Sequence, residues 1–369
     1  MSSIFSMANL GSFTVSFVSF VIVIGLCILV HELGHFLTAR ALGVQVHEFA
    51  LGMGPLVKQI KQEKKVNKND KYRTLWSLRL FPIGGFCRLA GMGEDADEES
   101  VVPGMGFNEQ PAWKRFFILL NGSVGNVILA LLLTTAFLCG YGVLNMRDTK
   151  IGTMMNGFPA QQAGFQVGDR ILEVNGARVA EWREMSGKLR EAAKDGDVTF
   201  TVERGEQTLT ISTPIPFSES HGYPMLGITP AMVRYSVPEA LQNAVGFAKE
   251  MTLSMFREIW KLITRQGEGE IDVVGPLGIA SMSGRAMRDG VWSFVTFLSL
   301  ISLHLGLLNL LPFPALDGGR IIFVFLEMLF RRRLPEKVEN WIHTAGFVLL
   351  ISLMIFVTWR DIHNIFFVE

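Results

Sequence analysis

The sequence predicts an α-helical membrane protein with four transmembrane helices, a membrane-associated β-hairpin and an inserted β-rich domain. Hydrophobic residues make up 49% of the 369 residues and the mean hydropathy is +0.33, values typical of a membrane protein. Four apolar runs are each long enough to cross a hydrocarbon core of about 30 Å. Much of the region between the second and third runs instead alternates apolar and polar residues, as strands do.

The first apolar run opens the chain. No charged residue occurs from Met1 to Val30, and the apolar sequence that begins at Thr14 extends to Ala39. A cleaved signal peptide would start with basic residues and end at a small-residue cleavage site, whereas this run leads directly into a histidine-containing segment. We therefore expect a spanning helix. Three further runs meet the same length criterion: Phe116–Leu138, Val291–Leu311 and Trp341–Trp359.

Basic residues predict the orientation of these helices. The N-terminal flank carries no Lys or Arg, while Arg40, Lys114 and Arg115 flank the segment between the first two spans. Arg320 and the run 331–333 lie between the last two. Because cytoplasmic segments carry an excess of Lys and Arg, both segments are expected to face the cytoplasm. Both termini and the region 140–290 are then extracytoplasmic.

The expected membrane core consists of residues 1–139 and 291–369. Within it, residues 75–92 alternate apolar and other residues on both sides of Gly84-Gly85, which predicts a short hairpin or a bent strand. The charged run Lys58–Lys71 and the acidic stretch Glu94–Glu99 are expected to be surface loops.

The region 140–218 is expected to form a small β-rich domain. From Pro159 to Gly176, the succession Pro-Ala-x-x-Ala-Gly-Phe-x-x-Gly-Asp-x-Ile-Leu-x-Val-Asn-Gly resembles a single PDZ domain of the bacterial protease-associated type. In the connector 219–290, Tyr223–Ile228 is either a carboxylate-binding loop or a plain strand. Apolar residues spaced by three or four at 237–263 predict an amphipathic helix, either on the membrane surface or packed on the PDZ domain.

Composition excludes some functions. The formal net charge is zero and the basic residues form no aromatic-interleaved stripe, so nothing supports nucleic-acid binding. Cys27, Cys87 and Cys139 provide neither a Cys-x-x-Cys pair nor a disulfide framework, and are expected to be packing residues.

A metal-binding motif ends the first span. His31-Glu-Leu-Gly-His35 places two imidazoles at positions i and i+4, on one face of a helix, where both reach one tetrahedral zinc ion. Glu32 is close enough to hold a water molecule at such an ion. Ionisable residues inside a span are costly and usually functional, so we expect a catalytic zinc site rather than a helix end with surface histidines.

A catalytic zinc ion needs a third protein ligand and an open position for water. The best candidate is Asp317, which follows Pro312 and Pro314. These prolines interrupt the third span and can turn the aspartate into a protein-lined cavity. His304 is a competing ligand, but a lone histidine on an apolar helix is more often a hydrogen-bonded core residue.

The motifs together resemble the site-2 protease family, and most closely its bacterial regulator of sigma-E protease branch. The resemblance rests on His-Glu-Leu-Gly-His in the first span, Asn309-Leu-Leu-Pro-Phe-Pro-Ala-Leu-Asp-Gly in the third, and the PDZ domain between them. Three shorter motifs extend it over most of the chain: Pro82–Met92, Trp113–Arg115 and Gly275–Ile279.

The resemblance implies an intramembrane zinc metalloendopeptidase of a bacterial inner membrane, with its active site towards the cytoplasm. It would cut single-span proteins such as anti-sigma factors or signal-peptide remnants. The implied roles are zinc ligation by His31, His35 and Asp317, general base and acid catalysis by Glu32, and polar contact with the reacting carbonyl by Asn309. A substrate strand is expected to pair with the edge near 84–89, and the expected substrate-binding residues are Gly84, Gly85, Phe86, Arg88 and Asn126.

Two departures from the family stand out. Many bacterial relatives carry two PDZ domains and this chain has one, so the filtering of bulky substrates is expected to be less strict. Relatives also commonly have Gly-Pro-x-x-Asn where this chain has Gly122-Ser-Val-Gly-Asn126, which leaves the local helix geometry open.

Two other functional classes compete with a protease. A membrane scaffold that gathers partners through its PDZ domain needs no metal triad. A zinc transporter or sensor should carry polar residues across its other spans, and the sequence shows no such chain of residues.

Overall fold

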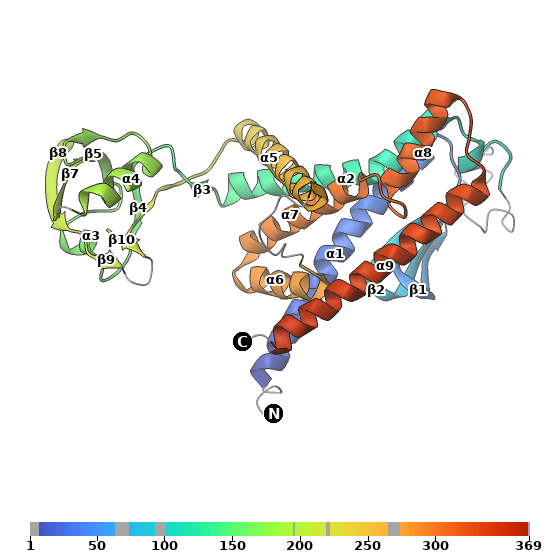
Figure 1. The fold of residues 1–369 in the computed structure, drawn as a ribbon, viewed down its shortest axis with the longest axis horizontal. Coiled ribbons are helices and arrows are strands. Elements are labelled where there is room, and N and C mark those ends of the chain that lie inside the picture. The colour runs from blue at the N-terminus through green and yellow to red at the C-terminus, as the bar shows by residue number, and fades with distance from the viewer. Residues whose placement is uncertain are drawn as a thin grey trace. The chain divides into compact units, whose positions relative to one another are not determined.

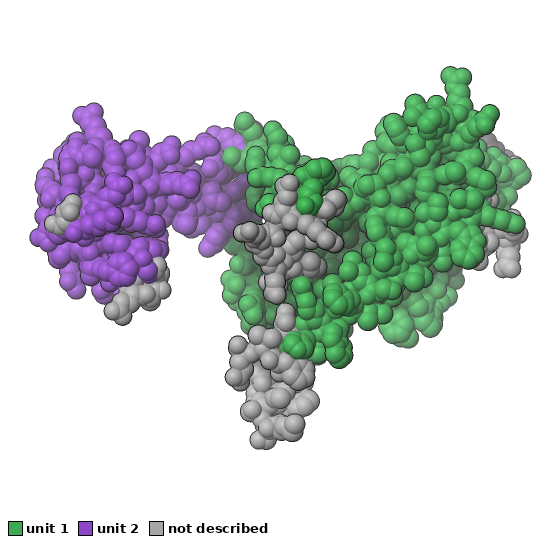
Figure 2. All heavy atoms as spheres, in the orientation of Figure 1, with its two compact units in different colours: residues 1–136, 241–369 green, residues 137–240 purple. Residues whose placement is uncertain are grey.

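The computed structural model describes residues 7–62, 74–92, 101–194, 196–218, 222–264 and 274–367. The chain divides into two compact units (Figure 2): residues 1–136 with 241–369, and residues 137–240. The predicted acidic loop Glu94–Glu99 lies outside the described residues.

The first unit is mainly helical (Figure 1). Its long helices are α1 (Met7–Ala41), α2 (Ala112–Gly140), α5 (Val237–Thr264), α6 (Pro276–Arg288), α7 (Val291–Asn309), α8 (Asp317–Phe330) and α9 (Glu336–Phe367). Four stretches in these helices are long and apolar enough to cross a membrane: Gly11–Ala41, Ala112–Gly140, Val291–Asn309 and Lys337–His363. They coincide with the four predicted spans. The second span is one continuous helix through Gly122-Ser, which answers the question about its local geometry.

Small residues let the helices that contain the candidate spans approach closely. A β-carbon at Gly34 of α1 would overlap the backbone of Asn121 in α2, and one at Gly306 of α7 would crowd the carbonyl of Ser123. The hydroxyl of Ser302 in α7 also donates a 2.9 Å hydrogen bond to the Asn126 carbonyl of α2. Close backbone contact and interhelical hydrogen bonds are what hold helices together in lipid.

A β-hairpin packs against α1. It consists of β1 (Val46–Gln62) and β2 (Leu75–Leu89), which pair antiparallel. Residues 46–51 pair on one side with 75–78 and on the other with 85–89, because β2 bends through Gly84, whose φ is +100°. The segment 85–89 is therefore an edge of the described sheet. The rings of Phe36, Phe49 and Trp76 pack together, with centroids 4.9–5.3 Å apart, and fix the hairpin to the helix.

The hairpin corrects one prediction from sequence. Lys58 and Gln59 belong to β1 and pair with Leu78 and Ser77, so the charged run begins in a strand and not in a loop. Its members 63–71 lie outside the described residues. Cross-strand pairing satisfies the backbone hydrogen bonds whatever the charge of the side chains. The charged residues alone therefore predict a loop where the chain forms a strand.

The second unit has a four-stranded sheet of order β6-β5-β7-β8 over the apolar side of helix α4. The strands and helices of this unit are β3 (Val143–Leu144), β4 (Ile151–Met154), α3 (Pro159–Gln162), β5 (Arg170–Val174), β6 (Ala177–Arg178), α4 (Trp182–Ala192), β7 (Asp197–Arg204), β8 (Gln207–Pro214), β9 (Phe217–Ser218), β10 (Tyr223–Pro224), β11 (Ile228–Pro230) and β12 (Met232–Val233). Fully buried Ile171, Val198 and Phe200 lie in its core.

This unit reaches further along the chain than the predicted PDZ domain, which ended at 218. Strand β11 pairs with β4 and β12 pairs with β3, so the segment after 218 closes the unit out to Ala240. The two strands are only three and two residues long, too short for a clear alternation in the sequence.

Helix α5 covers the predicted amphipathic segment. Large apolar side chains on it are exposed, among them Leu241, Val245, Phe256 and Trp260. Its contact with a membrane surface stays a prediction.

Candidate metal centre

Two histidines of α1 face the same point. His31 and His35 are one helical turn apart and buried, and their Nε2 atoms lie 3.1 Å from each other. The motif is far inside the helix: α1 continues for ten residues after His31, or about 15 Å at 1.5 Å per residue.

The third group comes from the break between α7 and α8. Pro312 and Pro314 lie in that break, and Asp317 is the first residue of α8. Its Oδ2 lies 2.9 Å from His31 Nε2 and 3.3 Å from His35 Nε2. β-Carbons at Gly318 and Gly319 would overlap the backbone of this turn, so the two glycines allow it to fold tightly over the start of α8.

The three atoms fit zinc. Their separations are 2.9, 3.1 and 3.3 Å. Zinc bonds of about 2.0–2.1 Å in a tetrahedral arrangement place neighbouring ligand atoms about 3.3 Å apart. Two imidazoles and one carboxylate form a donor set that zinc accepts and leave a fourth position for water. Among the described residues, His31, His35 and Asp317 form a group of His, Cys, Asp or Glu side chains whose ligand atoms lie close enough together to hold a metal ion.

Neighbouring groups fix the orientation of both imidazoles. His35 Nδ1 lies 2.8 Å from the Ile118 carbonyl, which accepts its proton and leaves Nε2 for a metal. His31 Nδ1 lies 3.5 Å from the amide nitrogens of Asn126 and Asn309. The Asn126 oxygen is buried without a hydrogen-bond partner among the described groups. The reverse orientation of this amide would let the oxygen accept the His31 proton, and the two orientations are indistinguishable in shape.

Gly122 makes room for the metal centre. A β-carbon there would overlap the His35 ring and would lie 2.9 Å from His31 Cε1. The sequence of this segment departs from the family by its missing proline and does not mark Gly122, whose function depends on a contact between α1 and α2.

Glu32, next to His31 in α1, contacts the hairpin. The backbone N–H of Cys87 donates a 2.9 Å hydrogen bond to Glu32 Oε2. Cys87 belongs to segment 85–89, so the outer edge of the hairpin meets the candidate catalytic carboxylate. No signal in the sequence pointed to Cys87 or to the Ile118 carbonyl, because both act through the backbone.

Of the other predicted site residues, the two asparagines lie beside His31 and the remaining ones lie on the hairpin. Asn309 is half-buried beside His31, while Asn126 is fully buried behind the same ring. Gly84, Gly85 and Phe86 lie on the bent strand at the hairpin edge. Arg88 is exposed and lies 3.7 Å from the buried Glu48 carboxylate, which also accepts two hydrogen bonds from Arg79 Nη2.

His304 is not part of the centre. Its Nδ1 lies 2.8 Å from the Leu300 carbonyl, one turn earlier in α7. This contact is the ordinary hydrogen bond expected of a histidine on an apolar helix.

The segment Tyr223–Ile228 begins with strand β10 and lies against α4. Together they line a cavity of about 150 Å³. The Arg190 guanidinium lies 4.2 Å from the centroid of the Tyr223 ring at this cavity.

A metal held by two histidines and an aspartate, with a glutamate beside it, is typical of hydrolytic zinc enzymes rather than of structural zinc sites, which use four protein ligands. Here the centre lies on a helix of spanning length, which indicates a metalloprotease of the membrane.

Comparison with known proteins identifies the family of the chain. The profile of peptidase family M50 matches residues 19–353, so the chain belongs to this family and is a zinc metalloprotease. A candidate zinc metalloprotease of Clostridium perfringens is 31% identical, over 91% of this chain and 95% of its own length. One of Fusobacterium nucleatum is 32% identical, over 95% and 99%. The PDZ domain of an SdrC-like protein from Listeria monocytogenes matches with a TM-score of 0.21 and 17% identity, over 24% of this chain and 92% of that domain.

Proposed function

We propose that this protease hydrolyses a peptide bond within the transmembrane segment of a single-span membrane protein, of the anti-sigma-factor or signal-peptide-remnant type. The observation that carries the proposal is the depth of the centre. His31 lies about 15 Å from the end of α1, a helix that is long and apolar enough to cross a hydrocarbon core of about 30 Å.

A transmembrane substrate must unwind before it is cut, because its carbonyls are held in helical hydrogen bonds. Segment 85–89 supports this step. It pairs with β1 on one side, and on the other side its Cys87 N–H points at Glu32. A substrate strand added along this edge would pass beside the metal centre with its backbone extended. Gly84, Gly85, Phe86 and Arg88 are the proposed contacts.

The roles of the residues follow from their positions. His31, His35 and Asp317 would hold zinc, which polarises the peptide carbonyl and acidifies a water molecule when bound. Glu32 accepts the proton of the attacking water as the new C–O bond forms, then delivers it to the amide nitrogen as the C–N bond breaks. Asn309, beside His31, donates a hydrogen bond to the developing oxyanion. Asn126, which the resemblance assigned to substrate binding, is fully buried and would instead support His31 from behind.

The proposed topology places the metal centre towards the cytoplasm and the PDZ unit outside. Its basis is the charge distribution. Basic residues flank the ends of the first and second spans that are joined by the hairpin, and others lie in the segment between the third and fourth spans. In this arrangement the single PDZ unit would hinder substrates with bulky outer domains, so that they are cut after shortening.

The test is cleavage of a model single-span substrate by the purified protein in detergent or liposomes, with the new termini identified by mass spectrometry. A cut inside the apolar segment supports the proposal. Cleavage confined to the loops outside the apolar segment would overturn it and leave an ordinary membrane-anchored protease.

A further inference from the structure

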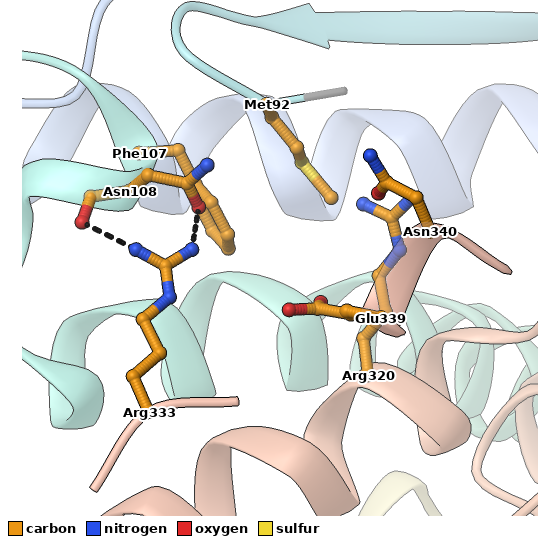
Figure 3. Close-up of a pocket in the computed structure, with 7 residues that line it drawn as sticks. All are labelled: Met92, Phe107, Asn108, Arg320, Arg333, Glu339 and Asn340. Carbon is orange, nitrogen blue, oxygen red and sulfur yellow. Dashed lines mark hydrogen bonds between the residues drawn. The ribbon is translucent and has the colours of Figure 1, made fainter. Parts of the chain in front are cut away.

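A polar cavity lies at the ends of two spans, apart from the metal ligands. Figure 3 shows its lining: Met92, Phe107, Asn108, Arg320, Arg333, Glu339 and Asn340. These side chains come from the residues after β2, from the short helix η2 (Phe107–Glu109) before the second span, and from α8, α9 and the turn between them.

Two guanidinium groups and one carboxylate line this cavity. Arg333 donates hydrogen bonds of 3.2 and 2.7 Å to the main-chain and side-chain oxygens of Asn108, which fix its position. The negative charges of Glu339 and Asp317 are close enough to act electrostatically on the Arg320 guanidinium. Yet within the described residues the side chains of Arg320 and Glu339 form neither a hydrogen bond nor an ion pair. Two half-buried opposite charges that share a cavity without pairing keep hydrogen-bonding capacity for a ligand or water.

The cavity lies where two candidate spans begin. The fourth candidate span begins at Lys337, so Glu339 and Asn340 are in its first turn, and the second begins at Ala112, shortly after Asn108. Trp113 and Trp341, next to these positions, are 50% and 76% exposed. Tryptophan is enriched at membrane–water interfaces, and basic pockets between spanning helices bind lipid headgroups there.

We propose that this cavity binds the headgroup of a membrane phospholipid, with its phosphate at Arg320 and Arg333 and a headgroup N–H or O–H donor at Glu339. The two guanidinium groups can donate hydrogen bonds to the oxygens of a phosphodiester, and the carboxylate would favour a headgroup that carries a hydrogen-bond donor. The cavity volume is about 30 Å³, about twice what one water molecule requires, so only the polar atoms that contact Arg320, Arg333 and Glu339 would enter it while the rest of the lipid stays outside.

The site also connects lipid to the metal centre. Arg320 lies three residues after Asp317, on the next turn of α8. A headgroup bound to Arg320 would therefore hold the first turn of the helix that carries the aspartate.

Native mass spectrometry of the full, zinc-loaded chain with added phosphatidylethanolamine tests the proposal without reference to proteolysis. The parent should retain one lipid, and Arg320→Gln should reduce that retention about tenfold, since hydrogen bonds to charged groups are strong. Arg332→Gln, which removes the same charge from an exposed position outside the cavity lining, should retain the lipid as the parent does. Equal retention by parent and Arg320→Gln would overturn the proposal.

Three further arms separate the alternatives. Phosphatidylcholine, which has the phosphate but no N–H donor, should be retained less well than phosphatidylethanolamine, and Glu339→Gln should reduce this preference. Displacement of the lipid by an equal concentration of inorganic phosphate would show a site for soluble anions. Failure of the parent to retain any lipid would show a water-filled cavity. Either result overturns the proposal. Zinc content checks the folding of each variant, and Arg320→Lys, which keeps the charge, should retain the lipid if Arg320→Gln does not fold.

Discussion

The backbone N–H of Cys87 and the carboxylate of Glu32 form a 2.9 Å hydrogen bond between the hairpin and α1, the helix that carries two of the candidate metal ligands. Side-chain replacement does not remove a backbone donor, but proline does. We expect Cys87→Pro to lower kcat by about 10- to 100-fold, the effect of losing a hydrogen bond to a charged group, with zinc content unchanged. Cys87→Ala keeps the N–H and should behave as the parent in the same cleavage assay.

Proline at Phe86 gives a comparison in the same strand. Successive residues of a strand point their N–H groups to opposite sides, so the Phe86 N–H faces β1, where Phe86 pairs with Ala50. Phe86→Pro should disturb the edge for substrate pairing and raise KM more than it lowers kcat. Identical effects of the two prolines on kcat and KM would show that the hairpin needs only to be intact, and would remove the case for a specific Cys87–Glu32 contact.

Replacement of Glu32 should separate activity from metal binding. Glu32→Gln is expected to keep one zinc per chain and to lose about 10²- to 10⁴-fold in cleavage rate, the contribution of a general acid–base residue. His31→Ala and Asp317→Ala should lose the zinc, since each removes one of three ligands. Metal analysis beside cleavage of a single-span substrate checks both. A scaffold predicts no difference among these variants, and a transporter predicts zinc flux without a cut product.

Gly122→Ala should weaken the metal centre from the neighbouring helix. The new methyl group would overlap the His35 ring, and displaced ligands should cost about 10-fold or more in zinc affinity, as disturbed supporting groups do. Gly246→Ala is the matched control, because a β-carbon at this helical glycine has no atom within 4 Å. Competition with a zinc chelator measures the zinc affinity of both variants, and unchanged affinity in Gly122→Ala would show that the metal centre does not depend on this contact between α1 and α2.

The pH dependence of the second unit should reflect Asp169. Burial raises the pKa of this carboxyl, but the hydrogen bonds from Arg204 and from the Gln166 N–H outweigh that effect and hold the pKa below its usual range. A lowered pKa contributes stability that is present above the unfolded value of about 3.9 and is lost as the pH falls through the folded value.

Asp169→Asn should therefore increase amide hydrogen exchange in β5 and β7 at pH 7, while the difference from the parent should shrink below about pH 4. The exposed Asp148–Arg170 pair provides the control, Asp148→Asn, which should change exchange little. A difference between Asp169→Asn and the parent that persists undiminished at low pH would assign the stabilisation to packing instead of charge.

Topology is testable by cysteine-accessibility labelling. A cysteine introduced at Asn175 should react with an impermeant reagent added outside the cell, and one at Arg332 only after the cytoplasmic side is opened. Both positions are exposed. Labelling of Asn175 from the cytoplasmic side would reverse the proposed orientation.

The sequence determined the features that depend on local periodicity. An apolar run of about 20 residues is long enough to cross a bilayer as a helix. The four candidate spans could therefore be predicted without knowledge of tertiary contacts. The pairing of His31 with His35 likewise follows from the helical repeat alone. Asp317 required more, because it is 286 positions from His31, and it was found through the prolines that break the third span.

Tertiary structure alone decided how these parts meet. The roles of Gly122 and Ile118 depend on the close packing of α2 against α1, and that of the Cys87 N–H on which edge of a bent strand faces Glu32. The β1 strand through Lys58 and the closing strands after 218 form through pairing with distant segments. Such contacts leave no periodic signal in the sequence. Each depends on one backbone atom or on the absence of one β-carbon, and not on a repeated pattern of side chains.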